Sequence, residues 1–291
     1  MKKTLAVLLF LACGSAARPE GIPWTHDLDA ALTQAGKENK WVFVDFYSDR
    51  CPACKNLDTL VYPRRRVVET ISRFVPVKIN APHETELASR YNVSAYPTLM
   101  VLDAEGRILE FLEGALPPDD FAELFEPISK GLNPLTELEK KARKAPNDPA
   151  ILVEVASGFL RRQHHAEALT HLEKGFPLAE PKSELREQTG RLMFVAASMR
   201  QDLHKVEEVL KAYSKEFPES RYVPLMYLDV GRVSYKSKEY QKAISHFEAA
   251  KEATSDFRLR LQAKRMIDLS KDRLEESAAG NHDAEEIRSA T

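Results

Sequence analysis

Two cysteines, Cys51 and Cys54, follow closely after an apolar run, and this combination constrains the fold more than any other feature of the sequence. The run, residues 41–47, is rich in β-branched and aromatic residues and contains one acid, Asp45, which predicts a buried central strand. After a short turn, Cys51 begins a predicted helix. Unpaired N–H groups and the helix dipole stabilise a thiolate at such a position, so the sequence predicts a reactive pair.

A C-x-x-C pair alone also fits half of a zinc site, which needs two further nitrogen or sulfur ligands. The chain has 3 Cys, and neither His26 nor His83 belongs to a spaced histidine pair near the cysteines. Haem attachment requires His directly after the second cysteine, where this chain has Lys55. We therefore predict a redox pair with no metal and no cofactor. The same expectation covers the more distant histidines His164, His165 and His171.

The N-terminus has the layout of a secretory signal peptide, predicted over residues 1–17. Two lysines precede the apolar run 5–12, which is shorter than the roughly 20 residues that span a bilayer. Small residues at Ser15 and Ala17 mark a cleavage site. A rival interpretation makes Cys13 a lipidated N-terminus, because Leu11-Ala12-Cys13 resembles a bacterial lipobox, and only then would the protein attach to a membrane. Both interpretations predict export to the periplasm of a bacterial cell envelope.

Residues 22–131 are predicted to form one α/β domain. Helical spacing of apolar residues over 27–35 and the strand at 41–47 are followed by the helix of the cysteine pair. Further strands are predicted at 74–79, 98–102 and 107–111, with helices at 84–91 and from Pro118. The order α-β-α-β-α-β-β-α predicts a mixed central sheet with helices on both faces.

The rest of the chain shows no strand pattern, and the sequence predicts a linker over 132–149, helices over 150–277 and a disordered tail over 278–291. Small residues recur twelve positions apart, with a large apolar residue four positions further on. The clearest copy is Gly231, Ala243 and Phe247, and the others are Ala156, Ala168 and Leu172, and more weakly Ala197, Val209 and Tyr213. These copies resemble tetratricopeptide repeats, in which small residues let two helices cross closely. The alternative is an irregular helical bundle.

Residues 42–55 resemble the active-site segment of the thioredoxin superfamily. The ending Cys-x-Ala-Cys-Lys and the preceding helix with Trp24 are most similar to the C-terminal thioredoxin domain of DsbD-type thiol:disulfide interchange proteins. Residues 93–99 resemble the cis-proline segment of that family, with Pro97 as the proline. The resemblance covers roughly residues 24–130 and implies a thioredoxin fold.

The resemblance also implies roles. Cys51 would be the nucleophile and Cys54 the resolving cysteine. Asp45 would be a buried carboxylate that takes the proton of Cys54, with Lys78 close to it, unless Asp45 is a partly exposed strand-end acid and Lys78 faces solvent. The backbone beside Pro97 would pair with substrate at Tyr96, whose side chain could equally serve packing.

Two residues beside the cysteines depart from the family pattern, and both are candidate substrate contacts. Arg50 stands where thioredoxins have Trp, and Pro52 is the first intervening residue. Both changes favour a more stable Cys51 thiolate and hence a higher reduction potential. The net direction of exchange therefore stays open.

These features predict an exported thiol:disulfide oxidoreductase that exchanges with protein thiols and disulfides and with a redox partner protein, while the helical repeats dock a client or partner. The alternative is an envelope scaffold or client-binding protein in which the redox pair is secondary. The 42 Lys+Arg and 44 Asp+Glu residues give a net charge of -2. This balance argues against nucleic acid as a partner.

Overall fold

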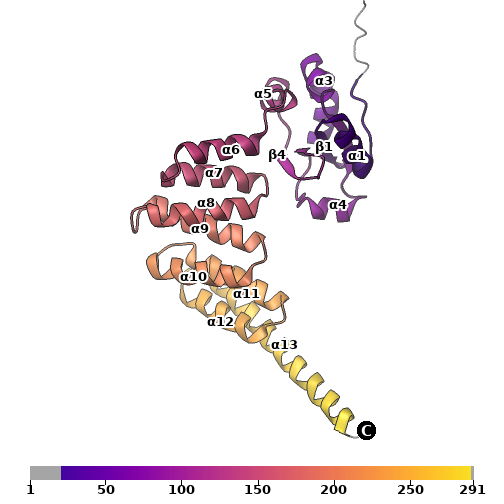
Figure 1. Cartoon of the computed structure of the whole chain (residues 1–291). Coiled ribbons are helices and arrows are strands. Elements are labelled where there is room, and N and C mark those ends of the chain that lie inside the picture. Colours follow the sequence, from indigo (N-terminus) through magenta and orange to yellow (C-terminus); the bar gives the residue numbers. More distant parts are fainter. Residues whose placement is uncertain (1–20, 290–291) are drawn as a thin grey trace, which may run out of the picture. The chain divides into compact units, whose positions relative to one another are not determined.

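The computed structural model of the chain describes residues 21–289 (Figure 1). The chain divides into two compact units, with the boundary between Leu132 and Asn133. The predicted signal peptide over residues 1–17 and the candidate lipidation site at Cys13 lie outside the described residues. None of the helices within 21–289 is both long enough and apolar enough to cross a membrane.

The first unit is a four-stranded mixed sheet with helices on both faces, as the sequence predicts. The strands lie in the order β2-β1-β3-β4, in which β1 and β2 are parallel and the other neighbouring pairs are antiparallel. The elements in chain order are α1 (Leu28–Glu38), β1 (Val42–Tyr47), α2 (Pro52–Asn56), η1 (Leu57–Val61), α3 (Arg65–Ile71), β2 (Val75–Asn80), α4 (Thr85–Arg90), β3 (Thr98–Leu102), β4 (Ile108–Glu113) and α5 (Pro118–Ser129).

Alternation along β1 decides which side chains reach the redox pair. Val44 belongs to the core that α1 and α4 form on one face of the sheet. Phe43 points to the opposite face and packs edge-on against Phe125 of α5, with ring centroids 5.2 Å apart. Because side chains two residues apart share a face, Asp45 lies on the side of Phe43, among the helices that follow the cysteines.

The helix that begins after Cys51 changes from α-helical to π-helical geometry at Leu57. Pro52 occupies the first helical position, where its missing N–H costs nothing. The five-residue segment η1 is a π-helical turn, which Tyr62 closes by donating its backbone N–H to Leu57 O at 2.8 Å. Such turns are rare and occur often at functional sites. Here the turn determines where Asp58 and Tyr62 project.

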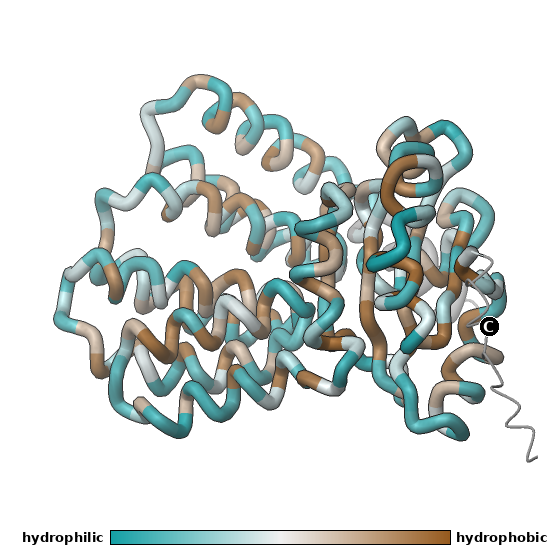
Figure 2. The backbone as a smooth tube through the Cα atoms, turned by 90° about the horizontal axis from the view of Figure 1, so that it is seen from above, coloured by the Kyte–Doolittle hydropathy of each residue, from teal (hydrophilic) through white to brown (hydrophobic). Residues whose placement is uncertain are grey.

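The second unit is entirely helical, and each helix packs mainly on its neighbours along the chain (Figure 1). Brown and teal segments alternate along these helices in Figure 2, as expected of amphipathic helices with one buried face. The elements are α6 (Pro134–Lys144), α7 (Pro149–Arg161), α8 (His165–Gly175), η2 (Phe176–Leu178), α9 (Glu184–Met199), α10 (Leu203–Glu216), α11 (Val223–Lys236), α12 (Tyr240–Glu252) and α13 (Phe257–Ser289).

The repeated small residues lie at the crossings of the helix pairs α7–α8, α9–α10 and α11–α12. At Gly231, an added Cβ would lie 2.5 Å from the ring of Phe247, so only glycine permits this approach of α11 to α12. In the weaker copy, Ala197 and Tyr213 are both buried between α9 and α10. The tetratricopeptide-like arrangement predicted from these spacings is therefore confirmed, in the form of stacked helix pairs that bury their faces against each other.

Two boundaries of the second unit differ from the prediction. The expected linker 132–149 contains the helix α6, because Asn133 caps its N-terminus by accepting from two backbone N–H groups and Pro134 fits its first position. Leu138 of α6 packs onto Gly158 of α7. The expected disordered tail from Ala278 is part of α13, whose sequence there contains no proline and is rich in Ala and Glu, both good helix formers.

Candidate active site

Cys51 and Cys54 form a disulfide across the first turn of α2. Cys51 is the N-cap residue, and its Sγ accepts the backbone N–H of Cys54 at 3.1 Å. The side chain of Cys54 is buried, with 2% of its surface exposed, whereas Cys51 is only partly buried. Cys51 is therefore the sulfur of the pair that another molecule can reach.

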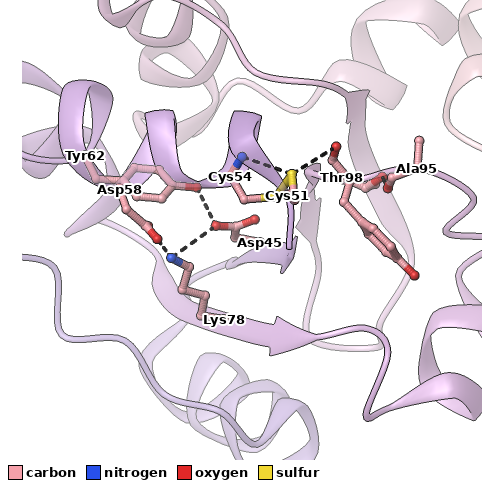
Figure 3. Close-up of a disulfide and its surroundings, with 9 residues drawn as sticks. Asp45, Cys51, Cys54, Asp58, Tyr62, Lys78, Ala95 and Thr98 are labelled. Atoms are coloured by element: carbon pink, nitrogen blue, oxygen red, sulfur yellow. Dashed lines mark hydrogen bonds and ion pairs between the residues drawn. A yellow bond between two sulfur atoms is a disulfide. The ribbon is translucent and has the colours of Figure 1, made fainter. Parts of the chain in front are cut away.

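The cis-proline segment lies directly beside the exposed sulfur (Figure 3). The Tyr96–Pro97 peptide bond is cis, and the carbonyl oxygen of Tyr96 lies 3.4 Å from Cys51 Sγ. Thr98 holds this segment by donating its hydroxyl to the carbonyl of Ala95 at 2.8 Å. Pro97 is buried, whereas the side chain of Tyr96 is 38% exposed. The segment thus places the backbone carbonyl of an exposed residue, Tyr96, next to Cys51.

Asp45 is fully buried on the face of β1 that the cysteine helix covers. Its Oδ2 accepts a hydrogen bond from the Tyr62 hydroxyl at 2.8 Å and lies 3.8 Å from Lys78 Nζ. Its Oδ1 is buried and has no hydrogen-bond partner among the described residues. Burial raises the pKa of Asp45 to about 6, against the opposing influence of the Lys78 charge and the Tyr62 hydrogen bond. A carboxyl group with this pKa exchanges protons readily near neutrality.

Lys78 is held in a box of aromatic rings and carboxylates. Its ammonium group pairs with Asp58 and lies 5.0 to 5.7 Å from the ring centroids of Tyr47, Tyr62 and Trp24. Only 12% of its side chain is exposed. Aromatic faces and carboxylates both attract a cation, so these groups hold the ammonium group in a position that is largely removed from water.

Sequence reasoning missed two residues of this site, Asp58 and Tyr62. Both follow Cys54 at intervals of four residues, a spacing that places side chains on one face of a helix. That spacing was the available signal. Burial and the charge of Asp45 raise the pKa of Tyr62 well above its ordinary value, so its hydroxyl stays protonated and can donate to the carboxylate.

Arg50 and Pro52 flank Cys51, and both are exposed. No ion pair of Arg50 occurs within the part of the chain that the structure describes, so its charge faces solvent next to the sulfur.

The structure brings Cys51, Cys54, Asp45 and Lys78 together in one site, with the Tyr96–Pro97 segment at its edge (Figure 3). Over residues 21–277, we found no group of three or more His, Cys, Asp or Glu side chains arranged to hold a metal ion.

A family model described as a thioredoxin-like domain matches residues 28–129. Together with the mixed sheet and the cysteine pair, this match shows that residues 28–129 are similar to thioredoxin-like domains. The resemblance stated from the sequence motifs is thereby confirmed.

Among known proteins, the domain is similar to the thiol:disulfide interchange protein DsbD of Vibrio cholerae, with 34% identity over 84 residues. That match covers 28% of this chain and 14% of the Vibrio protein. Thioredoxin-T of Drosophila melanogaster is 35% identical over 104 residues, which cover 34% of this chain and 60% of that protein. The crystal structure of the reduced Neisseria meningitidis DsbD C-terminal domain is 28% identical and covers 34% of this chain and 91% of that domain, with a TM-score of 0.32. The chain thus matches less than two thirds of either full-length relative.

Proposed function

We propose that this protein is an exported thiol:disulfide oxidoreductase that exchanges disulfides with protein substrates through Cys51. The observation that carries the proposal is the pairing of a reachable sulfur with a buried one. Cys51 stands at a helix N-terminus beside the backbone carbonyl of Tyr96, and Cys54 is buried one helical turn further on. A substrate can therefore form a mixed disulfide with Cys51 only, which is the order of events that a C-x-x-C exchange requires.

The reducing direction proceeds in two exchanges. The Cys51 thiolate attacks a sulfur of the substrate disulfide, and the other substrate sulfur leaves as a thiolate. Asp45 then takes the proton of the Cys54 thiol, and the Cys54 thiolate attacks Cys51 Sγ. The bond between Cys51 and the substrate breaks, its electron pair goes to the substrate sulfur, and the Cys51–Cys54 disulfide forms. Two electrons pass to the substrate, and the same steps in reverse oxidise a substrate dithiol.

The surface around Cys51 would select the substrate. An extended substrate segment beside the sulfur could pair with the backbone at Tyr96, next to the buried Pro97. Arg50 and Pro52, the chain neighbours of Cys51, supply an exposed positive charge and an exposed apolar ring. This combination favours substrates with apolar or acidic residues next to their disulfide.

Export rests on the N-terminal sequence. The lysines, the apolar run and the small residues of 1–17 support a signal peptide, with lipidation at Cys13 as the rival interpretation. The similarity to DsbD-type proteins supports a role in the periplasm, where disulfide exchange has substrates. A redox partner protein would then reset the pair after each turnover.

Trapping tests the proposed reaction. In a Cys54→Ala variant, the mixed disulfide at Cys51 cannot resolve, so we expect covalent adducts with substrate proteins that mass spectrometry identifies after non-reducing electrophoresis. Cys51→Ser should form no adducts and should lose the ability to reduce insulin disulfides. Retention of insulin reduction in Cys51→Ser would overturn the proposed function.

A second role, the docking of a client or partner, is supported by exposed apolar side chains on the helical unit. Val195 and Met199 of α9 and Leu225 of α11 have 40–61% of their surfaces exposed. Met199→Glu should reduce the set of proteins trapped by Cys54→Ala without changing the reduction of insulin. If proteins instead co-purify with the chain without a covalent bond, and this association depends on Met199 but not on Cys51, the scaffold interpretation is favoured.

A further inference from the structure

We propose that Tyr62 is a positioning residue, which holds Asp45 by one carboxylate oxygen so that the other oxygen is kept for the thiol of Cys54. This inference deepens the proposed function and rests on it. It concerns a residue that lies outside the C-x-x-C and cis-proline motifs.

Packing of its ring fixes the Tyr62 side chain independently of the hydrogen bond to Asp45. It follows the π-helical segment η1, has 5% of its surface exposed, and packs its ring against Trp24 and Phe121 with centroid separations of 5.1 and 6.2 Å. Its hydroxyl donates to Asp45 Oδ2 at 2.8 Å. Because the ring cannot move without disturbing these contacts, the hydroxyl sets the orientation of the carboxylate.

Both polar partners of Asp45 approach the same oxygen. Lys78 Nζ also lies nearest Oδ2, at 3.8 Å, and Oδ1 is left buried without a hydrogen bond. In Figure 3, the unpartnered oxygen points away from Tyr62 and Lys78, toward the Cys51–Cys54 disulfide. A buried acceptor without a donor is costly, so native structures rarely retain one without a reason. In the reduced protein, the Cys54 thiol would supply the missing donor.

The charged and titratable groups around Asp45 come from three elements. Lys78 of β2 lowers the pKa of Asp45, Asp58 of η1 raises it, and the cysteines of α2 complete the site. Tyr62 stabilises the charged form of Asp45 by its hydrogen bond. Loss of the hydroxyl should therefore raise the pKa of Asp45 and also free its carboxylate to turn.

The test compares Tyr62→Phe with a matched tyrosine. Tyr213→Phe is the control, because the Tyr213 hydroxyl also donates to a carboxylate, that of Glu187 at 3.1 Å, but in the helical unit. We expect the pH midpoint for resolution of the Cys51 mixed disulfide, followed in single-turnover reduction of insulin, to rise by about one pH unit in Tyr62→Phe. The rate of the first attack by Cys51 should not change, and Tyr213→Phe should behave as the wild type.

A measurement on the unaltered protein keeps the inference testable even if Tyr62→Phe does not fold. In the oxidised wild type, the ¹³C resonance of the Asp45 carboxyl should titrate with a midpoint of about 6. The Tyr62 Cζ resonance should shift with the same midpoint, because its hydroxyl senses the carboxylate. A Tyr62 resonance that does not follow Asp45 would overturn the role of Tyr62.

The two proposals fail separately. A resolution midpoint that is the same in Tyr62→Phe and the wild type, while Cys51→Ser is inactive, contradicts the role of Tyr62 and leaves the oxidoreductase intact. If Cys51→Ser still reduces insulin, the oxidoreductase itself is wrong. If Tyr62 had only a structural role, Tyr62→Phe would lower the unfolding temperature but would change neither the pH midpoint of resolution nor the titration midpoint of Asp45. That result would also count against the inference.

Discussion

Asp45 and Lys78 are direct neighbours on the parallel strands β1 and β2, and Asp45 Oδ2 lies 3.8 Å from Lys78 Nζ. Asp45 is fully buried. The strand register alone brings the two residues together. The ammonium group also pairs with Asp58, so it is shared between two carboxylates. This sharing explains why Lys78 only partly offsets the burial of Asp45, whose pKa stays raised at about 6.

The raised pKa of Asp45 predicts how the stability of the oxidised protein depends on pH. The folded protein holds a proton at Asp45 up to about pH 6, whereas the unfolded chain releases it near pH 4. The stabilisation is therefore present below pH 4 and is lost as the pH rises through 6, by about 3 kcal/mol in total. In Asp45→Asn this decline should disappear, so the variant should be more stable than the wild type at pH 8.

Urea unfolding at pH 4, 6 and 8 measures this difference. Asp49→Asn is the control, because Asp49 is an exposed carboxylate in the same unit, near the turn before Cys51. It should leave the pH dependence of the free energy of unfolding as it is. A wild-type stability that does not fall between pH 4 and pH 8 relative to Asp45→Asn would show that Asp45 is not protonated as expected.

Removal of the Lys78 charge should move the pKa of Asp45 upward. In Lys78→Gln, the carboxylate loses its nearest cation, so we expect its midpoint to rise above 6 by roughly one pH unit. Below that midpoint, the disulfide exchange rate should fall. Lys55→Gln removes an exposed lysine of the cysteine helix and should leave the midpoint in place. The ¹³C titration of Asp45 in the three proteins provides the comparison, and equal midpoints would contradict the prediction.

Substitution of Asp58 should act in the opposite direction. The charge of Asp58 raises the pKa of Asp45, and Asp58 also holds Lys78 away from a full contact with Asp45. In Asp58→Asn, both influences vanish, and the midpoint of Asp45 should fall by about half a pH unit. The pH profile of insulin reduction should extend to lower pH accordingly. A shift in the same direction as in Lys78→Gln would refute this account of the shared lysine.

The sheet and the first redox residues could be predicted because their signals are local. The buried strand of Asp45 is a continuous apolar run, and the strand Thr98–Leu102 has the bounds that its apolar residues indicate. Cys51 and Cys54 are recognisable by spacing, and Pro97 by its short motif. Each of these signals lies within a few residues of the feature that it marks.

The surroundings of Asp45 could not be predicted in the same way. In the sequence, Tyr62 cannot be distinguished from an ordinary core aromatic residue, because its hydroxyl donates to Asp45, which lies 17 positions earlier in the chain. The aromatic box of Lys78 draws on rings from three separate segments. The helix α6 lies inside the predicted linker for another reason: Asn133-Pro134 is typical of a loop between domains and is also a good helix start.

The crossing of α11 and α12 gives a prediction for the helical unit. In Gly231→Ala, the new Cβ would lie 2.5 Å from the ring of Phe247, which is fully buried and has no room to withdraw. Overpacking of this kind costs about 1–3 kcal/mol, against the roughly 1 kcal/mol by which Ala exceeds Gly in a helix. We therefore expect a lower unfolding temperature for the helical unit.

The matched control is Gly36→Ala in α1, where the nearest atom to the new Cβ, in Ala104, is 3.6 Å away. This is an ordinary contact distance, so the same chemical change should leave stability unchanged or raise it slightly through helix propensity. Thermal unfolding followed by circular dichroism compares both variants with the wild type. If Gly231→Ala is as stable as Gly36→Ala, the close approach of α11 to α12 does not depend on glycine, and the repeat spacing loses its physical basis at that crossing.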